Sequence, residues 1–272
     1  MNDAPGTLVS ARDGAIHVHR GGNGPPLVLV NGWSASGLIW GSRWLTALER
    51  HHDVVRVDNR GTGWSPASAA EFTLDDLCAD VLDVCDALEL QRPALLGMSM
   101  GGMIAQRLAV MDPQRWAALV LVATGPPIPA LVPAPEGVLG SMMGRPKGLS
   151  AKQMLSQMWG GIAAPGFAER DPGAVDELVS SALAAPTRLA VIAQQWGAIK
   201  GFRNPEMLDE IVAPTLIIHG INDPLLVVEN GRRLASSIRA ATLVERPDVG
   251  HLVPYEDPES AELITRFLAD VV

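Results

Sequence analysis

Short apolar runs alternate with helix-like patterns along most of this chain. Five of these runs have the composition of strands that are buried on both faces, and they cover residues 27–30, 53–58, 94–97, 117–123 and 215–220. The clearest helical pattern extends from Thr73 to Glu89, where Thr73 and Asp76 form a capping-box signature and apolar residues recur at helical spacing. Strands that alternate with helices predict an α/β fold, with a mostly parallel sheet and helices on both faces.

This alternation is interrupted between about residues 125 and 205. The interruption starts with a segment dense in proline and glycine, GPPIPALVPAPEGVLG, and continues with helical patterns that no strand separates. We interpret it as an inserted helical cap. We therefore expect a core domain formed by residues 1–124 and 206–272, and a cap, or lid, formed by residues 125–205.

The expected cap is rich in methionine and tryptophan. These side chains are large, soft and apolar, and they are suited to line an adaptable hydrophobic pocket. Alternatively, they only pack the cap onto the core domain, as such residues commonly do. The candidates for substrate contact are the cap residues Met142, Met143, Met158 and Trp159, together with Met98 and Leu252 beside the candidate catalytic residues described below.

Composition and charge narrow the class of protein. The chain has 272 residues, of which 47% are apolar, so it is long enough to bury a sizeable core. Its formal net charge of −9 is opposite to the basic face that nucleic-acid binding needs, and we expect no nucleic-acid partner. Cys78 and Cys85 lie within one helical pattern, a placement that suits two buried thiols rather than a disulfide framework.

The localisation is predicted from the same features. The segment MNDAPGTLVSARDG has neither the basic start nor the apolar run of a secretion signal, and no apolar stretch approaches the length of a membrane span. Free thiols suit the reducing conditions of the cytoplasm. We therefore expect a cytoplasmic protein without a membrane partner, either a monomer or a homodimer.

A candidate nucleophile lies in the motif G-x-S-x-G, which extends from Gly97 to Gly101 and has Ser99 at its centre. The motif follows an apolar run and precedes a helical pattern, so the serine occupies a tight strand-to-helix turn. Such a turn strains the backbone of the serine, and the glycines let helix and strand approach each other. This context makes Ser99 the candidate nucleophile.

A serine nucleophile needs a base, and the base needs a carboxylate that orients it. His251 lies in a loop before the final helical pattern, where the chain returns to the carboxyl ends of the strands. Asp223 follows the apolar run at 215–220 and so reaches the same edge of the sheet. Asp248 and Glu245 are nearer to His251 in sequence, but proximity on a loop does not orient a side chain. The order serine, aspartate, histidine is the one that this architecture uses.

The tetrahedral intermediate of acyl transfer needs two hydrogen-bond donors, which backbone N–H groups supply without reorganisation. We expect one donor from Met100, at the start of the helix after Ser99, and the other from Trp33, in the loop after the run at 27–30. Packing of the Trp33 indole under the cap is compatible with this role. Asp58 begins the segment DNRGTGWS, whose aspartate and arginine we interpret as braces for neighbouring loops.

Taken together, these motifs resemble the α/β-hydrolase superfamily. The resemblance rests on NGW, DNRGTGWS, GMSMGG, INDP and GH, and it covers nearly the whole chain. It implies a mainly parallel eight-stranded sheet, a helical cap inserted after the sixth strand and an acyl-enzyme mechanism without a cofactor. Most members have a histidine where this chain has Asn31, so this chain lacks any hydrogen bond that the histidine of those members makes. The backbone role of Trp33 does not depend on that side chain.

Within the superfamily, NGWSASGLIW, LVLVATGPPIP and the cap segment MWGG are similar to poly(3-hydroxyalkanoate) depolymerases and related esterases. The sequence therefore predicts a serine hydrolase that acts on a small or medium hydrophobic carboxylic ester or lactone. Two alternatives stay open. One is a carbon-carbon bond hydrolase with the same triad, and the other is a small-molecule receptor, against which the intact triad argues. No metal site is predicted, since no histidine and carboxylate pair has ligand spacing on one element.

Overall fold

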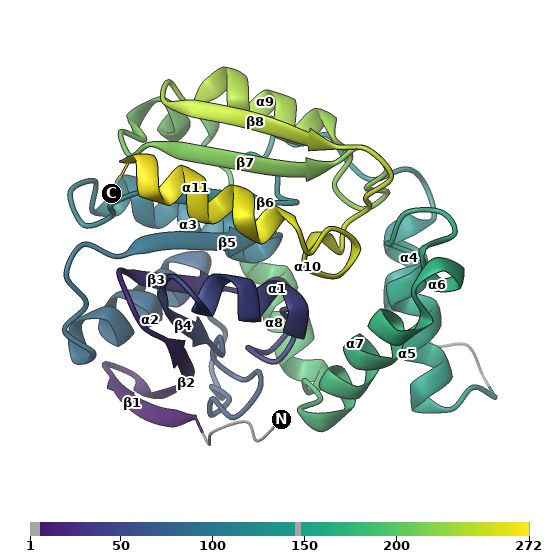
Figure 1. The fold of residues 1–272 in the computed structure, drawn as a ribbon. Coiled ribbons are helices and arrows are strands. Elements are labelled where there is room, and N and C mark those ends of the chain that lie inside the picture. Colours follow the sequence, from purple (N-terminus) through teal and green to yellow (C-terminus); the bar gives the residue numbers. More distant parts are fainter. Residues whose placement is uncertain (1–5, 145–147, 272) are drawn as a thin grey trace.

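The computed structural model describes residues 6–144 and 148–271. Within them, eight strands form one sheet in the order β1-β2-β4-β3-β5-β6-β7-β8 (Figure 1). The strands are β1 (Thr7–Ala11), β2 (Gly14–Gly22), β3 (Pro26–Val30), β4 (Asp53–Val57), β5 (Ala94–Met98), β6 (Leu119–Val122), β7 (Thr215–Gly220) and β8 (Ala241–Arg246). β2 pairs antiparallel with β1 and β4, whereas the other neighbouring pairs are parallel. This confirms the predicted α/β fold with a mainly parallel sheet.

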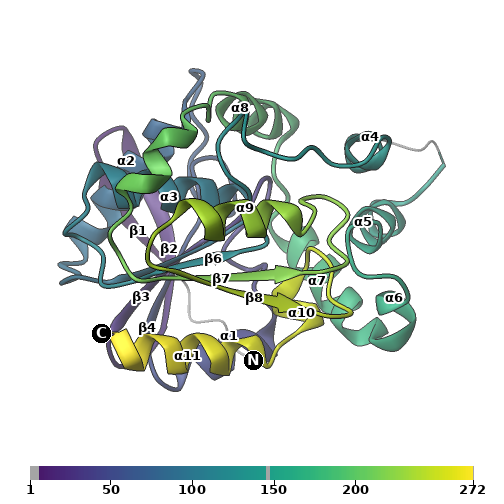
Figure 2. The same cartoon turned by 90° about the horizontal axis from the view of Figure 1, so that it is seen from above.

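Helices cover both faces of the sheet (Figure 2). One face carries α2 (Leu74–Ala87), α3 (Met100–Met111) and α9 (Glu229–Ser237), and the other carries α1 (Ser42–Glu49) and α11 (Ser260–Val271). Alternation along β3 shows the division, because Val28 and Val30 pack under the first set of helices and Leu27 and Leu29 under the second. All four side chains are fully buried, which stabilises the fold by about 1.5–3 kcal/mol for each. Burial on both faces explains why the strand is apolar throughout.

Helix α2 begins at the predicted capping box. The Thr73 amide donates to Asp76 Oδ2 at 2.7 Å, and the Asp76 amide donates to Thr73 Oγ1 at 3.3 Å. Cys78 and Cys85 lie on the buried side of this helix as free thiols. Burial raises the pKa of Cys85 to about 12 and raises the pKa of Cys78 as well, so both stay protonated at neutral pH.

The chain leaves the sheet between β6 and β7 and forms α4 (Val138–Met143), α5 (Ala151–Gly160), α6 (Phe167–Arg170), α7 (Pro172–Ala184) and α8 (Leu189–Lys200). A 3₁₀ helix, η1 (Pro205–Glu210), leads back to β7. α4 to α7 lie together beside the carboxyl ends of the strands in both views (Figures 1 and 2). This region corresponds to the segment that we expected to form a cap, of which residues 145–147 lie outside the described residues.

A separate apolar cluster joins these helices to the core domain. It packs cap side chains such as Trp159, Phe167 and Leu178 against Ile39 and Leu252 of the core domain. The helices of the insert therefore lie over the carboxyl ends of the strands. None of the described helices combines the length and the apolar character that crossing a membrane requires.

Candidate active site

Ser99 occupies the turn between β5 and α3, in a backbone conformation that few residues other than glycine adopt. Its φ of 55° and ψ of −120° carry a strain of about 1–3 kcal/mol. Two hydrogen bonds hold it there: the Ser99 amide donates to the Val122 carbonyl at 3.0 Å, and Thr124 Oγ1 donates to the Ser99 carbonyl at 2.7 Å. The neighbouring strand thus imposes a conformation that presents the serine at the carboxyl edge of the sheet.

The glycines of the motif allow the close approach that this turn needs. A Cβ atom on Gly101 would overlap the carbonyl oxygen of Val30, and one on Gly97 would overlap the carbonyl oxygen of Gly101. These obstacles are backbone atoms, which cannot rotate away as a side chain can. Helix α3 therefore packs directly on the strands, and its N-terminus lies at Ser99.

Asp223 and His251 form a buried pair at the same edge of the sheet. His251 Nδ1 and Asp223 Oδ2 are 2.7 Å apart, and the side chain of Asp223 is fully buried. Asp223 Oδ1 also accepts the amides of Leu225 and Leu226, at 2.8 and 2.9 Å. Because the Asp223 carboxylate can only accept, the neutral imidazole of His251 carries its proton on Nδ1. Its Nε2 is then free to act as an acceptor.

The electrostatics of Asp223 keep it ionised. Burial raises its pKa, but the charge of His251 and the hydrogen bonds from His219 and His251 outweigh burial and lower the pKa to about 2. His219 was not singled out as part of the site by the sequence. It is fully buried at the end of β7, with Nε2 3.5 Å from Asp223 Oδ2 and hydrogen-bonded to the Leu226 carbonyl. His219 therefore lies beside the carboxylate of Asp223 without lining the cavity described next.

Ser99 and His251 both line one cavity of about 1300 Å³. Of the two hydrogen bonds that a triad needs, the described residues show the one between Asp223 and His251, whereas Ser99 Oγ makes none to His251. Catalytic hydrogen bonds are often long in enzymes without substrate and tighten when the complex forms. The structure thus gathers the three predicted residues at one site.

The loop after β3 lies directly against the serine, because a Cβ on Gly32 would be 3.0 Å from Ser99 Cβ. Asn31 shapes this loop. Its Oδ1 accepts the Gly32 amide at 2.7 Å, and its Nδ2 donates to the carbonyls of Ser36 and Ile39 at 2.9 and 2.8 Å. In place of the histidine usual in the superfamily, this chain therefore has an amide side chain that closes the loop on itself.

The amides of Trp33 and Met100 were the predicted oxyanion donors. Both residues line the cavity beside Ser99. Among the described residues, neither backbone N–H has a protein acceptor, whereas the amide of the next loop residue, Ser34, donates to Gln195 Oε1 at 2.8 Å. Two donors next to the nucleophile are consequently available to a ligand, and the one at Met100 benefits from the helix dipole of α3.

Helix α8 of the insert holds the same loop in place. The Trp33 indole Nε1 donates to the Ile192 carbonyl at 2.8 Å, and its ring packs on Trp196 at a centroid distance of 5.4 Å. Thr187 Oγ1, just before the helix, donates to the Ser34 carbonyl at 2.9 Å. The cap therefore fixes the position of the loop that carries Trp33. Packing of the indole under the cap was weighed from the sequence, whereas the hydrogen bonds to Ile192 and from Thr187 were not predicted.

The cavity wall is predominantly apolar. All six predicted substrate contacts lie in its lining, namely Met98, Met142, Met143, Met158, Trp159 and Leu252. Met100, Met103 and Met154 also line it, so that seven methionines surround the space. Among the described lining residues there is no carboxylate, and Lys200 is the one permanent cation. The cavity is suited to an apolar molecule with few charges.

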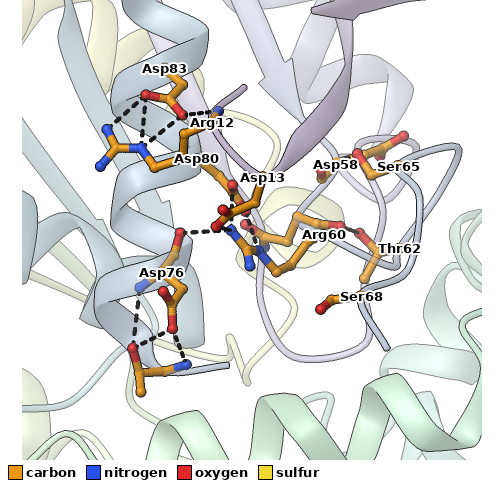
Figure 3. Close-up of polar contacts among 12 residues, drawn as sticks. Arg12, Asp13, Asp58, Arg60, Thr62, Ser65, Ser68, Asp76, Asp80 and Asp83 are labelled. Atoms are coloured by element: carbon orange, nitrogen blue, oxygen red, sulfur yellow. Dashed lines mark hydrogen bonds and ion pairs between the residues drawn. The ribbon is translucent and has the colours of Figure 1, made fainter. Parts of the chain in front are cut away.

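The DNRGTGWS segment lies outside this cavity lining and braces loops (Figure 3). Asp58 accepts the amides of Gly37 and Trp64. Arg60 Nε and Nη2 donate to the two carboxylate oxygens of Asp80 on α2, at 2.6 and 2.7 Å, and Figure 3 shows this pair beside Asp13. Burial raises the pKa of Asp80, and the Arg60 charge opposes that rise. The ion pair ties the loop after β4 to α2.

Among the described residues, one group, His17, His19 and Asp58, holds metal-ligating atoms close together, all within 4.8 Å of one another. Both carboxylate oxygens of Asp58 already form hydrogen bonds with other residues of the chain. Asp58 Oδ2 is 2.9 Å from His17 Nδ1 and accepts the Trp64 amide at 3.0 Å, while Oδ1 accepts the Gly37 amide. The group therefore has the contacts of a structural brace, outside the cavity that Ser99 lines.

Comparison with known proteins agrees with the fold and the motifs. A family model for the alpha/beta hydrolase fold matches residues 25–258. The chain belongs to this family. It is 30% identical over 237 residues to RutD of Variovorax paradoxus, a proposed carbamate hydrolase, with 86% of this chain and 87% of that protein covered. It is 27% identical over 237 residues to 3-oxoadipate enol-lactonase 2 of Acinetobacter baylyi, with 87% and 85% covered.

A solved structure extends the likeness to three dimensions. The esterase RhEst1 from Rhodococcus sp. ECU1013 superposes with a TM-score of 0.83 at 25% identity, and the match covers 99% of this chain and 100% of that one. These three relatives are named for different substrates, so the likeness indicates the reaction class more firmly than the substrate. The protein is a hydrolase of the alpha/beta hydrolase fold family.

Proposed function

We propose that this hydrolase cleaves hydrophobic carboxylic esters or lactones through an acyl-enzyme. One observation supports this proposal above all. The strained Ser99, the Asp223–His251 pair and two amides without protein acceptors lie together at one apolar cavity. These are the parts that acyl transfer to a serine requires.

In the proposed reaction, Ser99 Oγ attacks the carbonyl carbon while His251 Nε2 takes the hydroxyl proton. The negative oxygen of the tetrahedral intermediate accepts the N–H groups of Trp33 and Met100. His251 then gives its proton to the leaving alkoxide, and the carbon-oxygen bond of the ester breaks. A water molecule, deprotonated by His251, attacks the acyl carbon. The bond from this carbon to Ser99 Oγ then breaks, His251 returns the proton to Ser99 Oγ, and the acid is released. Asp223 stabilises the imidazolium that forms in both halves, since its low pKa keeps it charged.

The size and lining of the cavity support the hydrophobic substrate. About 1300 Å³ exceeds the roughly 300–1,000 Å³ that is usual for small-molecule pockets. Seven methionines line the wall, and methionine side chains adapt to ligands of different shape. An extended acyl chain or a bulky alcohol fits such a space, whereas a multiply charged substrate would leave its charges without partners.

The experiment is a series of nitrophenyl esters of increasing acyl length, with one variant that narrows the cavity and one that does not. Ala182 on α7 lines the cavity, and Ala184 on the same helix is exposed and does not. Ala182→Phe should shift the preferred acyl length to shorter chains, and Ala184→Phe should keep the wild-type preference. Absence of turnover for every ester and lactone, or the same preference in both variants, would contradict the proposal.

A further inference from the structure

Glu256 lies at the end of a short helix, α10 (Val253–Glu256), a few residues after His251. Its carboxylate is the acceptor for three backbone amides. Oε2 accepts Gly250 N at 2.8 Å and Ala164 N at 2.7 Å, and Oε1 accepts Leu252 N at 2.9 Å. Gly250 and Leu252 are the two neighbours of His251, so one carboxylate holds the backbone on both sides of the catalytic histidine.

The third donor, Ala164, belongs to the cap segment between α5 and α6. This segment also accepts the amide of the histidine itself, because His251 N donates to the Ile162 carbonyl at 2.9 Å. The two backbones are in close contact, since a Cβ on Gly250 would overlap Ala163 and Ala164. Ile162 lines the cavity. The histidine loop and a wall of the cavity are thus joined through Glu256.

Glu256 holds these three amides together through its carboxylate. Burial raises the pKa of Glu256, although the three amides and the charge of His251 oppose that rise. Hydrogen bonds from amides to an ionised carboxylate are shorter and stronger than those between neutral groups. Among the described residues, no arginine or lysine forms an ion pair with Glu256. Backbone amides, not a countercharge, therefore hold this carboxylate in position.

We propose that Glu256 is a positioning residue for the hydrolysis, which fixes His251 by clamping its loop to the cap. The expected effect on the rate of hydrolysis rests on the proposed function, whereas the clamping of the loop rests on the geometry alone. Ordering the backbone at Gly250 and Leu252 restricts the direction of the imidazole, so that Nδ1 keeps its contact with Asp223 and Nε2 can reach Ser99 when the substrate complex forms. Small displacements of a catalytic group have large effects on rate.

Glu256→Gln tests the clamp without changing the size of the side chain. A glutamine has one acceptor oxygen, so in either orientation its NH₂ group faces at least one of the three amides and repels it. We expect kcat for a nitrophenyl ester to fall about 10- to 100-fold. KM should change by less than about threefold, because the apolar wall that binds the substrate is retained.

The matched control is Glu259→Gln, an exposed glutamate three positions further along the chain. It makes the same chemical change and should keep wild-type kcat. Thermal unfolding of each variant measures its stability. If Glu256→Gln does not fold, Glu256→Asp takes its place, because a carboxylate that is one methylene shorter cannot reach the amides on both sides of His251.

A second readout does not depend on turnover. The Nδ1 proton of His251 lies in a 2.7 Å contact with Asp223 and should give a far-downfield NMR signal, assigned by its loss in His251→Gln. In Glu256→Gln, or in its replacement Glu256→Asp, this signal should broaden or shift, and in Glu259→Gln it should not. An unchanged signal together with wild-type kcat would overturn the proposal for Glu256. If the wild type cleaves no ester, the proposed function fails, and the NMR comparison still decides the role of Glu256.

Discussion

Replacing Asp223 by asparagine should reverse the hydrogen bond between this residue and His251. In the wild type, Oδ1 accepts the amides of Leu225 and Leu226, and Oδ2 faces His251 Nδ1 at 2.7 Å. An asparagine has a single acceptor oxygen, and the two amides select it for the Oδ1 position. Its NH₂ group then faces His251 and donates to Nδ1, so that the proton of the neutral ring moves to Nε2.

A ring that carries its proton on Nε2 cannot take the proton of Ser99. Loss of the general base through the wrong tautomer lowers kcat by about 10⁴-fold, which corresponds to about 5.5 kcal/mol in the barrier. The assay is steady-state hydrolysis of a nitrophenyl ester by Asp223→Asn and by a control, Asp248→Asn. Asp248 is exposed and three residues from His251, and its replacement should leave kcat close to that of the wild type.

Two results would contradict a role of Asp223 in orienting His251. If Asp223→Asn keeps more than about a tenth of wild-type kcat, the orientation of His251 does not depend on this carboxylate. If Asp248→Asn loses as much as Asp223→Asn, the loop carboxylate acts on the histidine in solution, against the geometry described above.

Three further predictions concern the support of the site. Gly101→Ala should abolish activity and lower the free energy of unfolding by about 1–3 kcal/mol, because the new Cβ overlaps the backbone of β3; a stable, active variant in urea unfolding would contradict that close contact. Asp80→Asn should lower the free energy of unfolding by about 3–5 kcal/mol, since it leaves the buried Arg60 without its nearer carboxylate partner, and a loss below about 1 kcal/mol would show that the pair does not hold the loop. Cys78 and Cys85 should resist iodoacetamide in the native protein and react in guanidinium chloride, because burial raises the pKa of both thiols; rapid labelling of the native protein would argue against their burial.

The fold was largely predictable because its strongest signals are local. Strands buried on both faces are continuous apolar runs, and the runs at 94–97 and 215–220 correspond to β5 and β7 with at most one residue of difference. The capping box at Thr73 marks the start of α2 because its two hydrogen bonds join residues three positions apart. Ser99 was recognisable for the same reason, since its motif, strand and helix are adjacent in the sequence.

The contacts that position the site were not predictable in this way. Gln195 reaches Ser34 across 161 residues, and Glu256 reaches Ala164 across 92. Such pairs depend on how the cap docks on the core domain, and no periodicity in the sequence encodes docking. His219 is a related case. Its place at the end of a buried strand was apparent from the sequence, but its proximity to Asp223 follows from the turn after β7.

The proposed function requires Ser99 to be an activated nucleophile in the cavity that it lines with His251. Intact mass after treatment with a fluorophosphonate, on the wild type and on Ser99→Ala, tests it most directly. We expect one added label per wild-type chain and none on Ser99→Ala, with both proteins folded. Failure of the folded wild type to take up the label, or equal labelling of Ser99→Ala, would contradict the assignment of Ser99 as the nucleophile.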